Sequence, residues 1–129
     1  LGGPLVINLA SDVRLAARGS FRLGLTEAAA GIPFPAGPLA VVHAELAPSQ
    51  IRTLALGSLP AGPDSNLFAG IIVRVVEPET LLEAALEEVR RLSSLPAYGR
   101  VKRQLRAGTI ERLSQIVERD EEPLLTRWV

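Results

Sequence analysis

The clearest hydrophobic pattern lies in the second half of the chain. After residues 77 and 78, apolar residues recur at three- and four-residue steps with charged residues between them: Leu82, Ala85, Leu86, Val89 and Leu92. This spacing places the apolar side chains on one face of a helix, which Pro96 ends. From Tyr98 onward, two more apolar stripes separated by Gly108 predict amphipathic helices that pack against another surface.

Shorter apolar runs predict strands. Residues 71–76 are β-branched at five of six positions, which favours a strand buried on both faces. Residues 13–16 and 20–25 predict two further strands joined by a turn at residues 18 and 19.

Glycine and proline divide the first half into short helices. Pro4 suits the first turn of a helix, because its missing N–H would have no partner there, and we expect a helix over residues 4–10. Two more are expected over residues 37–46 and 48–57, each beginning near a proline, and another short helix stops at Gly70. Strands separated by helices predict an α/β fold.

Composition narrows the function classes. The chain has 129 residues, 14 basic and 14 acidic side chains, and 47% hydrophobic residues, so we expect one domain with no bulk attraction to nucleic acid. No apolar run approaches the roughly 20 residues of a membrane span, and the first residues lack the basic segment of a signal peptide. These features predict a cytoplasmic protein that binds no membrane.

Cysteine and histidine limit the chemistry further. The chain has no cysteine and a single histidine, His43, so we expect no disulfide, no thiolate nucleophile and no metal site. His43 is most simply a surface or partly buried side chain. The chain also begins with Leu1 and contains no methionine, which predicts an excised, processed or engineered piece.

Several short motifs follow one another in a defined order. They are Gly2-Gly3 at a helix start, Ser11-Asp12-Val13-Arg14 after that helix, Phe21-Arg22-Leu23-Gly24, Thr26-Glu27 before Gly31, residues 67–76 and residues 78–82. This order resembles the crotonase superfamily, the enoyl-CoA hydratases and isomerases. The resemblance implies a crotonase-like spiral of short strands and helices that lacks the N-terminal half. It divides the chain into a core portion, residues 1–95, and an amphipathic helical oligomerisation tail, residues 96–129.

The resemblance also implies a chemistry. Family members bind acyl-CoA thioesters, need no other cofactor, and stabilise the thioester enolate with two backbone N–H groups. One donor precedes this chain, and the other corresponds to the N–H of Gly3, with Gly2 beside it in contact with substrate. Glu27 corresponds to the second of two glutamates that transfer protons in the hydratases.

The basic residues 100, 102, 103 and 106 have two interpretations. By resemblance, Lys102 and Arg103 bind the phosphates of CoA. Alternatively, the whole cluster is a solvated helix face. Asp12 is interpreted as a turn residue whose carboxylate accepts from backbone N–H groups.

Departures from the family pattern leave two functions open. Val6 stands where the first glutamate is expected, and Pro4 replaces a third glycine. The first function is an acyl-CoA hydratase or isomerase fragment whose activity is weak or lost. The second is a non-catalytic, truncated or engineered structural and assembly module. In either case the resemblance implies a trimer-based homo-oligomer. Glu27 could correspondingly be a loop residue that caps a neighbouring element, and Trp128 could anchor in a neighbouring subunit or be disordered.

Overall fold

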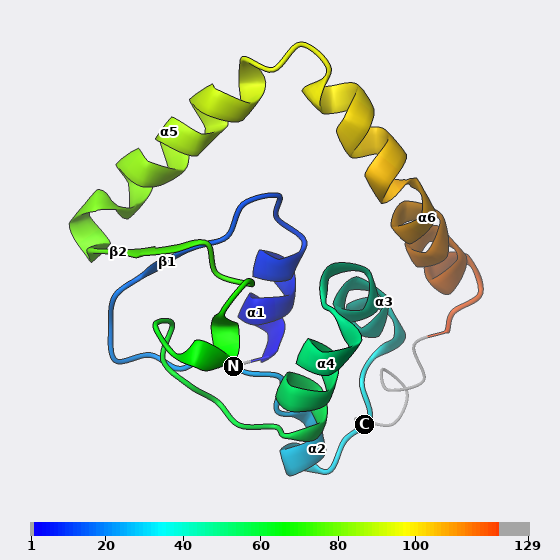
Figure 1. Ribbon diagram of the computed structural model, residues 1–129. Coiled ribbons are helices and arrows are strands. Elements are labelled where there is room, and N and C mark those ends of the chain that lie inside the picture. The colour runs from blue at the N-terminus through cyan, green and yellow to red at the C-terminus, as the bar shows by residue number, and fades with distance from the viewer. Residues whose placement is uncertain (1, 122–129) are drawn as a thin grey trace.

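The computed structural model describes residues 2–121, in which helices outnumber strands (Figure 1). The α-helices are α1 (Gly2–Leu9), α2 (Glu27–Ala30), α3 (Ala36–Glu45), α4 (Pro48–Ile51), α5 (Leu81–Ser93) and α6 (Tyr98–Glu118). A π-helical stretch, η1 (Arg52–Leu56), continues α4, and the short 3-10 helices are η2 (Asn66–Phe68) and η3 (Pro78–Thr80). The strands are β1 (Leu15–Ala17) and β2 (Arg74–Val76). Trp128 lies outside the described residues.

The core surrounds α1, which Figure 1 places between the two strands and the α3–α4 pair. Leu5 and Leu9 recur four residues apart on this helix and are completely buried, as expected for one helical face. The other fully buried large side chains come from α3, α6, η1, η2 and the segments beside them: Leu25, Val42, Leu54, Phe68, Ile71 and Ile116. The helices expected over residues 4–10, 37–46 and 48–57 are therefore confirmed, with shifts of a few residues at their ends.

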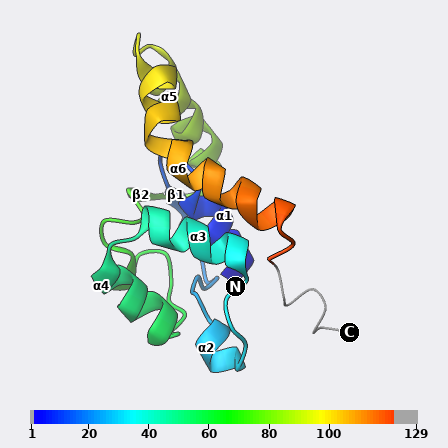
Figure 2. The same ribbon diagram turned by 90° about the vertical axis from the view of Figure 1, so that its right-hand side faces the viewer.

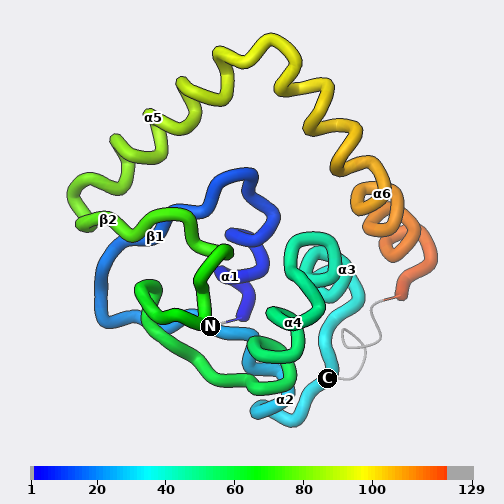
Figure 3. Tube along the Cα trace, in the orientation of Figure 1, coloured from blue at the N-terminus to red at the C-terminus, as the bar shows by residue number. Residues whose placement is uncertain are grey.

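The sheet differs from the sequence prediction. β1 pairs in parallel with β2, with Ala16 opposite Val75, and Figure 3 shows these distant segments side by side. The expected hairpin of residues 13–16 with 20–25 is wrong. Instead, Leu23 exchanges both backbone hydrogen bonds with Ala61, at 2.9 Å each, while Leu25 enters the core. Each of the two expected strands therefore pairs with a segment far away in the sequence and not with the other.

The expected buried strand over residues 71–76 is also only partly correct. Ile71 is buried, but it belongs to the segment that follows η2, and the strand begins at Arg74. Val73 is 69% exposed. The described sheet has two strands of three residues each, and Val73 precedes β2, so the expected strand buried on both faces does not form there.

Helices α5 and α6 form an arch, residues 81–118, above the core (Figures 1 and 2). Ala84 is buried where α5 meets β1, whereas Leu82, Leu86 and Val89 are exposed. Only part of that apolar stripe is covered in the described chain, so its packing against another surface stays a prediction. Gly108 lies inside α6, which is one continuous helix instead of two. The boundary expected between residues 95 and 96 falls in the turn at the top of the arch.

Candidate functional site

The first turn of α1 lies against the carboxylate of Glu27. Glu27 is the first residue of α2, and a Cβ atom built on Gly2 would lie 2.9 Å from its Oε1 atom. Only glycine leaves room for a carboxylate this close to the backbone. The first N–H groups of a helix have no acceptor within the helix, and their dipoles favour a negative group there. The two expected site elements are thus brought together in space.

One oxygen of this carboxylate is unsatisfied. Glu27 Oε2 is buried and has no hydrogen-bond partner among the described residues. Leaving a buried polar atom unpaired is costly, and such atoms in folded proteins call for an explanation. An acceptor shielded from bulk water can take a proton, or bind a hydrogen-bond donor that enters the site.

Gly3 differs from Gly2 in its surroundings. It is exposed, and a Cβ built on it would meet no atom within 4 Å. Its N–H belongs to the first turn of α1, where intrahelical acceptors are lacking. Val6 lies one turn further along and packs against the core. The expected position of a second carboxylate is therefore occupied by a core side chain.

A charged cluster lies beyond the opposite end of α1. Asp12 accepts hydrogen bonds from Tyr98 Oη, from Lys102 Nζ at 2.6 Å and from Arg106 Nη2 at 3.0 Å. Arg106 Nη1 also pairs with Glu45 Oε1 at 2.5 Å. The cluster thus joins the loop after α1 to α3 and α6.

Arg14 completes the charged cluster from the core side. Its Nη2 atom donates to Leu9 O at 2.8 Å, at the end of α1, and to Glu45 Oε2 at 2.5 Å. Arg14 and Glu45 are only 14% and 15% exposed, so solvent screens this pair less than an ordinary surface pair. The last carbonyl groups of α1 therefore receive a cation, as the helix dipole favours.

The contacts within the cluster change the pKa values of three of its members. Partial burial opposes ionisation of Asp12, but the hydrogen bonds from Lys102, Tyr98 and Arg106 outweigh it and hold its pKa below the usual value. The hydrogen bond to Asp12 raises the pKa of Lys102 and that of Tyr98. All three effects favour a charged, closed cluster near neutral pH.

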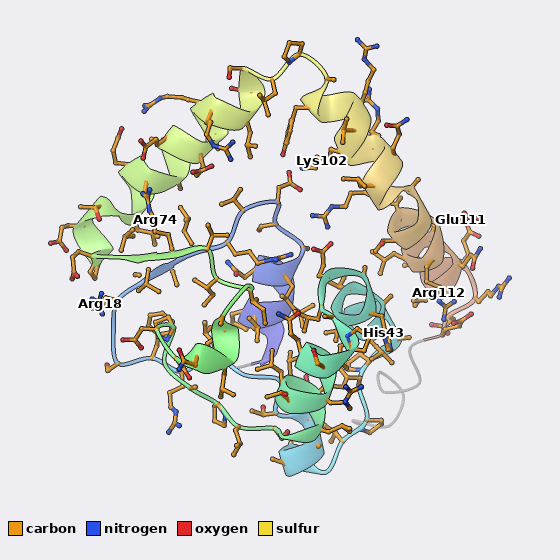
Figure 4. The ribbon with its side chains drawn as sticks, in the orientation of Figure 1. Arg18, His43, Arg74, Lys102, Glu111 and Arg112 are labelled. Atoms are coloured by element: carbon orange, nitrogen blue, oxygen red, sulfur yellow. The ribbon has the colours of Figure 1, made fainter. Side chains whose placement is uncertain are left out.

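The structure separates the basic residues from the Glu27 site. Lys102 is engaged by Asp12 at the far end of α1, and Figure 4 shows it on the upper part of α6. Arg103 is exposed on the same helix. The interpretation of Asp12 as a cap for backbone N–H groups is wrong, because its carboxylate bonds to side chains of α6. These partners are 86 to 94 residues away, so no local sequence pattern could have identified them.

An open cleft of about 550 Å³ lies under the arch. Its apolar wall comes from α5 and β1, including Leu15, Ala85 and Leu92, and its polar end contains Asp12, Tyr98 and Lys102.

Within residues 2–121, no group of three or more histidine, aspartate or glutamate side chains could hold a metal ion. In the same part of the chain, no helix has the length and apolar character needed to cross a membrane. His43 is exposed on α3 (Figure 4).

Comparisons with known proteins identify the fold. No protein-family model matches the chain, and no curated protein matches it in sequence. Among solved structures, an enoyl-CoA hydratase/isomerase family protein from Pseudomonas syringae matches 90% of this chain and 51% of its own, with a TM-score of 0.77 and 24% identity. An enoyl-CoA hydratase from Mycobacterium ulcerans matches 86% and 49%, with a TM-score of 0.73 and 24% identity.

An enoyl-CoA isomerase from Mycobacterium tuberculosis matches the chain to a similar extent. It matches 88% of this chain and 51% of its own, with a TM-score of 0.74 and 21% identity. The chain therefore spans about half the length of these solved structures. It has the α/β, crotonase-like fold predicted from its motifs, with the helix α6 near its C-terminal end.

Proposed function

We propose that this chain carries one half of an acyl-CoA hydratase or isomerase site, in which Glu27 transfers a proton and the N–H of Gly3 donates to the thioester oxygen. The observation that carries this proposal is the buried, unpaired Oε2 atom of Glu27 beside the first turn of α1. A base and a set of backbone donors at one place are what enolate chemistry at a thioester requires. The fold shared with enoyl-CoA hydratases and isomerases supports the same class of substrate.

The residues favour double-bond migration over hydration. Val6 provides no second carboxylate, whereas hydration by two groups needs one residue to activate water and another to protonate carbon. In migration, one carboxylate can remove a proton from one carbon and return it to another, so that substrate and product have the same atoms. Donors fixed in a helix turn stabilise the negative charge that develops on the thioester oxygen between the two steps. Because the solved neighbours are about twice as long, we expect the remaining contacts to substrate to come from outside the matched half.

A second candidate is a non-catalytic assembly module. Its support is the exposure of large apolar side chains along the arch, among them Leu82 at 71%, Leu105 at 78% and Val117 at 81%. Apolar surface of this kind marks interaction sites, and a second copy of the chain is the simplest partner. This candidate needs no role for Glu27.

The variant Glu27→Gln separates the two candidates. It keeps the size of the side chain but removes the base, so the first candidate predicts loss of turnover of a short unsaturated acyl-CoA by at least about 100-fold. Glu79→Gln is the matched control, because Glu79 is an exposed glutamate on η3. Turnover would be followed spectrophotometrically for both variants and for the parent chain.

Three results decide between the candidates. Loss of turnover in Glu27→Gln alone supports the enzymatic function. Equal turnover in all three proteins rules out Glu27 as the base. A parent chain that neither turns over nor binds the thioester in calorimetry supports the assembly module instead.

A further inference from the structure

Ser58 is an unusual residue for its position. It is 8% exposed and the one buried polar residue in the described part of the chain. It also has a φ of 53°, in the left-handed region that non-glycine residues rarely adopt. A polar residue held in a strained conformation inside a protein suggests a specific task.

The hydroxyl of Ser58 bonds on both sides of Glu27. Ser58 Oγ donates to the carbonyl of Leu25 at 3.1 Å and accepts from the N–H of Ala29 at 3.1 Å. Leu25 and Ala29 lie two residues before and two residues after Glu27. A single side chain, more than 25 residues away in sequence, thus fixes the backbone that carries the carboxylate.

Helix α2 depends on this contact. It has only four residues, and a single turn is not stable without outside support. The N-cap residue Thr26 makes no side-chain hydrogen bond to the helix. Ala29 is the third residue of α2, and its N–H is one that an N-cap hydroxyl normally satisfies. Ser58 therefore supplies the cap from another part of the chain.

The position of Ser58 follows from the element before it. The π-helical stretch η1 ends at Leu56, and the N–H of Ser58 still bonds to the carbonyl of Leu54 at 3.2 Å. Leu54 is buried in the core. Ser58 thus lies just beyond η1 and is tied to its buried part by this backbone hydrogen bond.

We propose that Ser58 is a positioning residue for Glu27: it caps α2 from the segment just after η1 and so holds the carboxylate against Gly2 at the start of α1. This role rests on the proposed function of Glu27 in proton transfer. The cap itself can be tested without any turnover. Without the hydroxyl, the backbone on both sides of Glu27 loses a fixed partner, and the carboxylate loses its orientation toward substrate.

The first test measures hydrogen exchange at single amides by NMR. Ser58→Gly removes the hydroxyl but suits the left-handed backbone, so it removes the cap without adding strain. We expect exchange of the Ala29 amide to quicken at least about tenfold, while the Leu46 amide, bonded to Val42 O on α3, keeps its protection. The control Thr53→Ala removes another hydroxyl, which bonds to Ser49 O on the same stretch, and should leave Ala29 unchanged. Unchanged Ala29 exchange in Ser58→Gly overturns the inference.

The second test is a double-mutant cycle on turnover. Ser58→Gly is expected to lower kcat about tenfold at nearly constant KM, because orientation of the base is lost while the thioester still binds. In the Glu27→Gln background the same change should have no further effect, since Ser58 acts through Glu27. An additive loss in the double variant shows that Ser58 acts through general stability, which overturns the inference.

The two proposals fail in different ways. If Glu27→Gln keeps full turnover, the proposed function is wrong. If Glu27→Gln loses turnover but Ser58→Gly retains the parent kcat, the function stands and the positioning role is wrong.

Discussion

At the scale of single residues, the site depends on one close approach. The Glu27 carboxylate lies where a side chain on Gly2 would be, but the space around Gly3 is open. The two adjacent glycines thus have different roles. Gly2 provides room for the carboxylate, while Gly3 contributes only its backbone N–H, which any residue except proline would retain.

Alanine substitutions at these two glycines should therefore have different effects. In Gly2→Ala, the new Cβ displaces the end of a flexible side chain, so we expect turnover to fall at least about tenfold with little change in stability. In Gly3→Ala, both properties should stay close to those of the parent chain. Kinetics and thermal unfolding of the two variants check this. Equal turnover in both variants would contradict the close approach of Glu27 to Gly2.

The candidate site was partly predictable at this scale. The order of short motifs singled out Gly2, Gly3 and Glu27, and the structure places the Glu27 carboxylate beside Gly2. Ser58 and Asp12 could not be assigned in the same way. Ser58 bonds to Ala29, which is 29 residues away, and Asp12 bonds to Lys102, which is 90 residues away. Hydrogen bonds over such separations leave no periodic pattern in the sequence.

At the scale of elements, the sequence predicted helices better than strands. Helical periodicity is local, so α5 was recognised from its own residues, and α3 was placed from the proline near its start. A strand needs partners, and the partner of β1 is β2, nearly sixty residues later. The local pattern favoured a hairpin instead. Helix α6 shows the same limit: Ile116 is buried, but the other attachments of the helix use charged residues such as Arg106, and apolar residues such as Leu105 face solvent.

The attachment of α6 should depend on pH. The pKa of Asp12 lies below its ordinary value of 3.8, because the hydrogen bonds from α6 outweigh the effect of burial. A carboxyl with a lowered pKa stabilises the fold fully above its ordinary pKa, and that contribution disappears as the pH falls through its pKa in the folded chain. Asp12→Asn should therefore lower the free energy of unfolding by about 1 kcal/mol at pH 7 and have a smaller effect near pH 2.

Urea unfolding at the two pH values measures this difference. Asp64→Asn serves as the control, because Asp64 is 62% exposed and its contact with Arg18 is 3.5 Å long. It should change stability little at either pH. A loss in Asp12→Asn that is the same at pH 2 and pH 7 would show that the ionised carboxylate does not hold α6.

At the scale of the whole molecule, the arch leaves large apolar side chains exposed. The described chain buries Leu5 and Leu9 of α1 but leaves Leu82, Leu105 and Val117 in solvent. Exposed apolar side chains spread over two helices favour association with a partner. We expect the partner to be further copies of the chain, in a trimer-based assembly.

Sedimentation velocity tests this expectation. Leu105→Glu places a charge at an exposed apolar position of α6 and should shift the chain from an oligomer toward the monomer. Gln104→Glu adds the same charge at the neighbouring exposed position and should leave the assembly intact. A parent chain that sediments as a monomer at all concentrations would contradict the expectation.

The attachment of α6 also determines when the molecule can be completed during synthesis. Asp12 is made 90 residues before Lys102, an interval of roughly 5 to 18 seconds at the usual rates of translation. Throughout that time its carboxylate has no cation from α6, and the side of β1 that later faces the cleft stays exposed to solvent. The β1–β2 pair also waits for a long loop to close. A nascent chain of this fold therefore passes through a prolonged stage in which the core around α1 has only part of its cover, and we expect chaperones to bind during that stage.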